Sequence, residues 1–144
     1  MILLDVNVLV YAHHEGAPDH ARYKKWLKSL VSGNESFGVT DLVFSGFLRI
    51  ITHPAIFDPP GNLERALEFI DFLKRSERFV PVAPGELHWG IFEKLCRESK
   101  ARGNLVSDAY HAACAVENVA DWVTTDQDYR RFKRLKTRHP LQER

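Results

Sequence analysis

Two short apolar segments of this chain each run directly into an aspartate. The segment "ILL" (residues 2–4) is followed by Asp5, and "WVTT" (122–125) is followed by Asp126, with Asp128 two residues later. Ligands in open α/β sheets bind beyond the carboxyl ends of the strands, so these aspartates converge if the two strands are neighbours. Because Asp5 lies between two apolar runs, its charge is expected to be buried with a partner or to serve a function.

The remaining sequence alternates short strand-like segments with longer helical ones. This order predicts an α/β fold with a central, mostly parallel sheet of four or five strands. A length of 144 residues suits one domain, residues 1–144, and the proline-rich segment 53–62 is expected to be a loop. The expected strands are 2–4, 36–40, 79–83 (at an edge, because Pro81 has no N–H) and 122–125. The expected helices are 6–14, 17–30, 42–52, 63–76, 85–99 and 107–119.

A third carboxylate, Asp108, is expected in the first turn of helix 107–119, where it could join Asp5 and Asp126, with Asp128 as a fourth acid. Clustered carboxylates raise one another's pKa values, and a hard divalent cation such as Mg²⁺ or Mn²⁺ relieves that repulsion. Such an ion can generate a hydroxide nucleophile, so phosphodiester hydrolysis is the natural reaction.

A purely structural interpretation of the same acids is also open. Asp108 could be a first-turn anion favoured by the helix dipole, and Asp126 and Asp128 could cap the following turn. Taken together, the acids favour a metal site.

Four segments, "MILLDVNVLVYA", "FLRIITHPAIF", "GNLVSDAYHAACAVEN" and "VTTDQDYRRF" followed by "HPL", resemble the PIN-domain ribonucleases, and among them the VapC-type toxins, in the family's order. The resemblance implies an α/β/α fold, an endoribonuclease dependent on Mg²⁺ or Mn²⁺, inhibition by a cognate antitoxin, and a homodimer. It places Asp5, Asp108 and Asp126 on the metal and Asp128 on an additional acidic position. Thr125 and Asn7 fall on positions that orient ligands.

One position departs from the family pattern. Gly46 stands where many members carry a glutamate, so one bound ion is expected rather than two. Gly46 also supports an alternative function, a PIN-like RNA-binding module without activity. A haloacid-dehalogenase-like phosphatase is a second alternative, but that chemistry wants an acid where this chain has Asn7.

The basic residues give a local charge that the net value of +1 hides. Arg130 and Arg131 begin a basic run that ends at Arg138, and this run is expected to hold the RNA backbone unless it is only a solvated helix face. Arg49 is expected to face the substrate or the antitoxin. The tryptophans Trp26, Trp89 and Trp122 are expected in the core.

The N-terminus has no basic leader, and no apolar run approaches the roughly 18 residues of a membrane span. Together with only two cysteines at no metal-type spacing, this favours a cytoplasmic protein without membrane contact.

Overall fold

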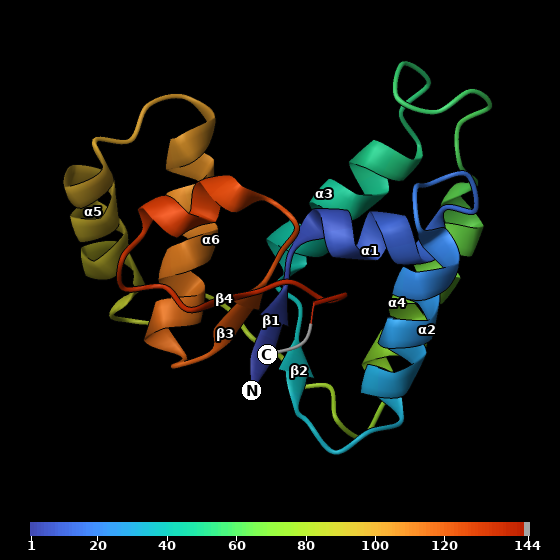
Figure 1. Ribbon diagram of the computed structural model, residues 1–144, viewed down its shortest axis with the longest axis horizontal. Helices are drawn as coiled ribbons and strands as arrows, with labels where there is room; N and C mark the ends of the chain where they lie inside the picture. The colour runs from blue at the N-terminus through green and yellow to red at the C-terminus, as the bar shows by residue number, and fades with distance from the viewer. Residues whose placement is uncertain (143–144) are drawn as a thin grey trace.

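The computed structural model describes residues 1–142 and has a four-stranded sheet at its centre (Figure 1). The strands are β1 (Ile2–Leu4), β2 (Phe37–Gly38), β3 (Asp121–Val123) and β4 (Thr137–Arg138). Their order is β2-β1-β3-β4, and all neighbouring pairs are parallel. The predicted parallel sheet is therefore confirmed, with β1 and β3 side by side in its middle.

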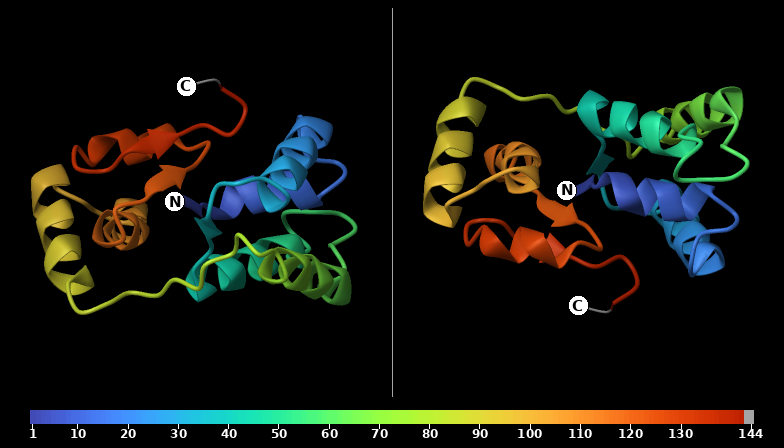
Figure 2. Two further views of the ribbon diagram at one scale, coloured as in Figure 1. Left: turned by 90° about the horizontal axis from the view of Figure 1, so that it is seen from below. Right: turned by 90° about the horizontal axis from the view of Figure 1, so that it is seen from above.

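Helices cover the sheet on both sides (Figures 1 and 2). One pair, α5 and α6, lies on one side of the strands, while the helices from α1 to α4 lie on the other, which confirms the α/β/α arrangement. None of the helices within residues 1–142 is long and apolar enough to cross a membrane. The helices are α1 (Val6–His13), α2 (His20–Val31), α3 (Asp41–Ile51), α4 (Leu63–Lys74), α5 (His88–Ser99), α6 (Asn104–Glu117) and the short 3₁₀ helix η1 (Gln127–Arg131).

The central strand β1 is short and entirely apolar because helices cover both of its faces. Ile2, Leu3 and Leu4 are fully buried, as are Val123 and nearly all of Trp122 in the neighbouring strand. A parallel sheet that is buried on both faces selects continuous apolar runs instead of alternation. Its strands consequently end where the first polar residues appear, at Asp5 after β1 and at Thr124 after β3.

The predicted edge strand 79–83 is wrong. Only Phe79 forms a bridge, to Phe37, and the Val80 N–H donates to the Phe37 carbonyl at 2.8 Å. Pro81 follows and has no N–H, so the pairing cannot continue along this segment. The fourth strand is instead β4, at the end of the basic run, whose first two arginines, Arg130 and Arg131, lie exposed in a short 3₁₀ helix.

Helix α6 begins earlier than residue 107. Gly103 has a φ of +56°, which favours glycine, and the helix starts directly after it at Asn104. Asp108 is therefore the fifth residue of α6 and not a first-turn anion, so the helix-dipole interpretation loses its basis. Ala109 and Ala112 are fully buried on the predicted small-residue face, and α6 packs against β3 and α5.

Candidate active site

The ends of β1 and β3 bring the first two predicted acids together. Leu4 pairs with Val123, and the N–H of Asp5 donates to the Val123 carbonyl at 3.0 Å. The chain after Asp5 turns into α1, and the chain after Val123 continues through Thr124 to Asp126. The predicted neighbourhood of these two strands, on which the site depends, is confirmed.

Asp5 is almost completely buried and both of its carboxylate oxygens accept a hydrogen bond. The Val6 N–H donates to Oδ1 at 2.7 Å, and the Thr124 hydroxyl donates to Oδ2 at 2.6 Å. Burial raises the pKa of Asp5 to about 6; the two hydrogen bonds oppose this shift, and the charges of Asp108 and Asp126 add to it. Asp5 is thus a carboxylate held at a fixed orientation in an environment that disfavours its charge.

Asp126 combines a capping role with a place at the site. Its Oδ1 accepts the N–H of Asp128 at 2.8 Å, which caps η1, while its own N–H donates to the Thr124 hydroxyl at 3.0 Å. The alternative in which Asp126 caps the next turn is therefore correct for its hydrogen bond. The same residue also lines the largest pocket, whereas Asp128 is exposed and lies outside that lining.

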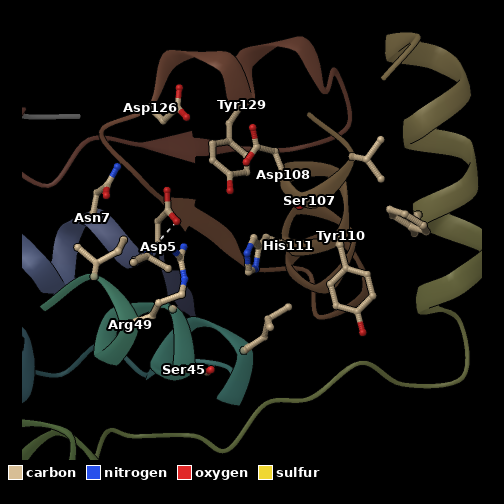
Figure 3. A pocket seen from close by; sticks show the side chains of 16 residues that line it. Asp5, Asn7, Ser45, Arg49, Ser107, Asp108, Tyr110, His111, Asp126 and Tyr129 are labelled. Atoms are coloured by element: carbon tan, nitrogen blue, oxygen red, sulfur yellow. Dashed lines mark hydrogen bonds between the residues drawn. The ribbon is translucent and has the colours of Figure 1, made fainter. Parts of the chain in front are cut away.

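A residue that was not predicted from the sequence, Tyr129, lies beside Asp108 at the cavity (Figure 3). Tyr129 is 2% exposed, and its hydroxyl is close enough to affect the pKa of Asp108. Burial raises the pKa of Asp108, the charges of Asp126 and Asp128 add to the rise, and the Tyr129 hydroxyl opposes it. Burial beside these acids also raises the pKa of the Tyr129 phenol, so it stays protonated. A buried tyrosine three residues after Asp126 carries no sequence signal that separates it from a core residue.

These side chains surround a cavity of about 560 Å³ between α3, α6 and the ends of β1 and β3 (Figure 3). The predicted residues Asn7 and Arg49 line it, and so does Gly46. In Figure 3 the Arg49 side chain extends from α3 into the pocket on the side opposite Asp126. An apolar wall completes the cavity, with Leu42, Ile50, Phe92 and Val106 among its members.

His111 lines the same cavity, and its ring packs against the core. Its ring stacks on Trp122 with 5.7 Å between the centroids, and burial lowers its pKa. Trp122 is in the core as predicted. The prediction for Trp89 is wrong, since 61% of that side chain is exposed at the start of α5.

Three predicted substrate residues lie away from this cavity. Thr125 and Arg130 line a separate depression on the other side of Asp126, and Arg131 is exposed and lines neither. Thr125 was predicted to orient ligands at the site. The threonine that contacts Asp5 is instead its neighbour, Thr124.

The donor set fits a hard cation that retains part of its water shell. Within residues 1–142, no three acidic, histidine or cysteine side chains are already placed to hold an ion jointly, and no ion pair involves Asp5, Asp108 or Asp126. Mg²⁺ commonly binds through one or two carboxylates and several waters, which suits three acids spread around a cavity. Burial is the main cause of the raised pKa values of Asp5 and Asp108, and the repulsion among the neighbouring aspartates that adds to them is what a cation would relieve.

The chain that forms this parallel α/β/α sandwich, with acids beyond the ends of its two central strands, matches the PIN domain family over residues 2–135. The chain belongs to the PIN-domain family, which sets the phosphatase alternative aside. Its relatives are VapC proteins. It is 40% identical to Ribonuclease VapC43 of Mycobacterium tuberculosis, over 98% of this chain and 96% of that protein, and 35% identical to Ribonuclease VapC25 of the same organism, over 97% and 99%.

Solved structures show the same fold. The chain superposes on the VapBC2 structure from Rickettsia felis, which was determined bound to a DNA fragment from its promoter, with a TM-score of 0.71 at 20% identity, covering 96% of this chain and 98% of that one. The VapBC-1 structure from nontypeable Haemophilus influenzae gives a TM-score of 0.70 at 19% identity, covering 99% and 100%. The resemblance to VapC-type PIN domains is confirmed.

Proposed function

We propose that this protein is an endoribonuclease that needs Mg²⁺ or Mn²⁺, hydrolyses RNA phosphodiester bonds, and acts as the toxin of a toxin–antitoxin pair. The observation that carries the proposal is the arrangement of Asp5, Asp108 and Asp126 around one cavity, with no cationic side chain paired to them within residues 1–142 and with the pKa values of Asp5 and Asp108 raised. The VapC relatives are named ribonucleases, which supports RNA as the substrate class.

In this proposal the three aspartates hold the ion, directly or through water. When bound, the ion would activate a water and stabilise the charge that develops on the scissile phosphate. Thr124 fixes the orientation of Asp5 through its hydrogen bond, and the Tyr129 hydroxyl lies beside Asp108. Asn7 and Arg49 are placed at the cavity wall, where an amide and a guanidinium can hold phosphate oxygens.

The partner proposed for this site is a small antitoxin, since the similar solved structures are VapBC assemblies. A cavity with carboxylates on one side and an apolar wall on the other can accept an arginine and apolar side chains from a peptide. A homodimer in the cytoplasm belongs to the same proposal and rests on the family likeness alone.

The test is cleavage of a structured RNA pool by the purified protein and by Asp5→Asn, each with Mg²⁺, Mn²⁺ or EDTA. We expect cutting by the wild type with either metal and loss of cutting in EDTA or in Asp5→Asn. The matched control is Asp41→Asn, because Asp41 is an exposed acid on α3 that does not line the cavity. Equal cutting by all three proteins would indicate a contaminating nuclease and contradict the proposal.

The second candidate is an RNA-binding PIN-like module without activity. Gly46 favours it, because this wall residue brings no carboxylate to the cavity. The same experiment separates the two functions. Folded wild-type protein that binds RNA but cuts none of it with either metal would establish the binding module.

A further inference from the structure

A second depression adjoins the active-site cavity on the other side of Asp126. It has a volume of about 290 Å³ and a strongly polar lining. Asp126 belongs to the lining of both hollows, so the two meet at this residue. The lining residues come from the β3–η1 segment and from the chain around β4: Thr124, Thr125, Asp126, Gln127, Arg130, Thr137, Arg138, His139 and Gln142.

The two arginines of this depression differ in their charge balance. Arg138 donates to Glu35 at 2.8 Å and to Asp121 at 2.9 Å, and its side chain is only 16% exposed, so its charge is already compensated. Arg130 is exposed, and no ion pair of Arg130 occurs in the part of the chain that the structure describes. Arg130 therefore supplies the available positive charge.

Apart from the Asp126 carboxylate at its border, the other side chains lining the depression are uncharged and can donate hydrogen bonds. The backbone N–H of Leu141 donates to Nδ1 of His139 at 3.1 Å, so in the neutral ring the proton is on Nε2, which becomes a donor. Burial and the nearby charge of Arg22 lower the pKa of His139 and keep the ring neutral at pH 7. Thr125, Gln127 and Gln142 add hydroxyl and amide groups.

We propose that this depression binds a backbone phosphate of the RNA next to the scissile one, so that the strand passes from the carboxylates over Asp126 to Arg130. One exposed guanidinium among neutral donors suits a phosphodiester, which carries a single negative charge and accepting oxygens. A cation would find only one carboxylate among the described lining residues. This inference rests on the proposed function, because it assigns a neighbouring phosphate of the same substrate.

The chain contains a matched control for this subsite. Arg131 follows Arg130, carries the same charge and is also exposed, but it lines neither hollow. Diffuse electrostatic attraction would weight the two arginines alike, whereas a phosphate subsite distinguishes them. Both side chains are exposed, so Arg130→Gln and Arg131→Gln are expected to fold, and equal melting temperatures would verify it.

The experiment measures cleavage of one defined RNA by wild type, Arg130→Gln and Arg131→Gln in Mg²⁺ over a series of salt concentrations. We expect Arg130→Gln to raise KM roughly tenfold with kcat little changed, as for a lost charge-assisted contact. For Arg130→Gln, the slope of log KM against the logarithm of the salt concentration should be smaller than the wild-type slope by about one unit. Arg131→Gln should change KM less than about twofold.

A chemically modified substrate locates the contact. A neutral methylphosphonate replaces each phosphate beside the cut in turn. At one of these positions it should raise the wild-type KM as much as Arg130→Gln does, and it should add nothing further in that variant.

Two failures are distinguishable. If the wild type cuts RNA but the two arginine variants are weakened equally, or neither is weakened, the subsite is wrong and the nuclease stands. If the wild type cuts no RNA with either metal, the proposed function fails and the subsite with it.

Discussion

The hydroxyl of Thr124 donates to Oδ2 of Asp5 at 2.6 Å and joins two residues that are 119 positions apart in the sequence. The same hydroxyl oxygen accepts the N–H of Asp126 at 3.0 Å. One threonine therefore connects the ends of β1 and β3 and orients two of the three aspartates that we assign to the metal.

We predict that Thr124→Val destabilises the metal-free protein by roughly 1–3 kcal/mol at pH 8, because it leaves a buried carboxylate oxygen without its donor. The same change should raise the pKa of Asp5 further and weaken Mn²⁺ binding. Urea unfolding in EDTA measures the stability, and a Mn²⁺ titration measures the affinity. Valine keeps the volume of threonine, so the loss reports the hydroxyl group.

Two further variants test whether the hydroxyl itself is responsible. Thr124→Ser keeps the donor and should restore most of the stability and Mn²⁺ affinity. Thr125→Val removes a hydroxyl from the adjacent residue, which lines the other depression, and should leave both quantities near their wild-type values. Equal losses in Thr124→Val and Thr125→Val would show that the Asp5 contact has no special role.

The pKa of Asp5 predicts how stability depends on pH without metal. Its pKa is about 6 in the folded protein against 3.8 ordinarily, so the folded state binds the proton more tightly than the unfolded state does. Stability therefore falls as pH rises from about 4 to 6 and stays reduced above that range. The shift of about two units corresponds to roughly 3 kcal/mol.

Asp5→Asn removes this titration and should become progressively more stable than the wild type between about pH 4 and pH 6 in EDTA, with a nearly constant advantage above that range. Urea unfolding at half-unit pH steps measures the difference. Asp41→Asn is the control and should give a flat difference. Added Mg²⁺ should reduce the advantage of Asp5→Asn, because the ion stabilises only proteins that bind it. A difference that does not vary with pH would contradict the buried position of Asp5.

The position of the candidate site could be predicted from sequence because two of its acids, Asp5 and Asp126, come soon after apolar strands. Strand ends are visible as a change from apolar to polar residues, and parallel neighbours place their carboxyl ends together. The choice between Thr124 and Thr125 could not be predicted. The chain leaves the sheet after Val123, so strand alternation no longer tells which side chain turns towards Asp5.

Other features depended on tertiary contacts that no local pattern encodes. Strand β4 has two residues, and they belong to the sheet because Trp122 and Val123 pair with them. Tyr129 is a site residue only because α6 places Asp108 beside its hydroxyl. The basic run is uniform in sequence. In the fold, however, Arg138 forms ion pairs, whereas Arg130 lines the depression beside the site.

We predict that Arg138→Met destabilises the protein by about 2 kcal/mol, because it removes the guanidinium from which Glu35 and Asp121 accept hydrogen bonds. This arginine holds β4 against β3 and the segment before β2, and methionine keeps its apolar stem. Arg134→Met is the control, since Arg134 and Glu98 pair at 2.9 Å with both side chains about half exposed, and its melting temperature should hardly change. Similar losses in both variants would mean that burial of the Arg138 pair contributes nothing.

The last prediction concerns Gly46, the wall residue without the family's acid. A Cβ at this position would lie 3.2 Å from Cγ2 of Val6, so that side chain must shift by a few tenths of an ångström. Alanine also gains about 1 kcal/mol of helix propensity over glycine, so Gly46→Ala should stay within about 1 kcal/mol of the wild type.

Gly46→Glu adds a fourth carboxylate to the cavity wall. Compared with Gly46→Ala, which carries the same shift of Val6, it should be less stable in EDTA at pH 8, because like charges crowd one another. Mn²⁺ should bind more tightly to the glutamate variant and should raise its melting temperature by more than it raises that of the alanine variant. Calorimetric titration gives affinity and stoichiometry together. A stoichiometry that rises from one ion to two would show that Gly46 limits the wild type to a single ion. Identical Mn²⁺ binding by the two variants would place residue 46 outside the metal's reach.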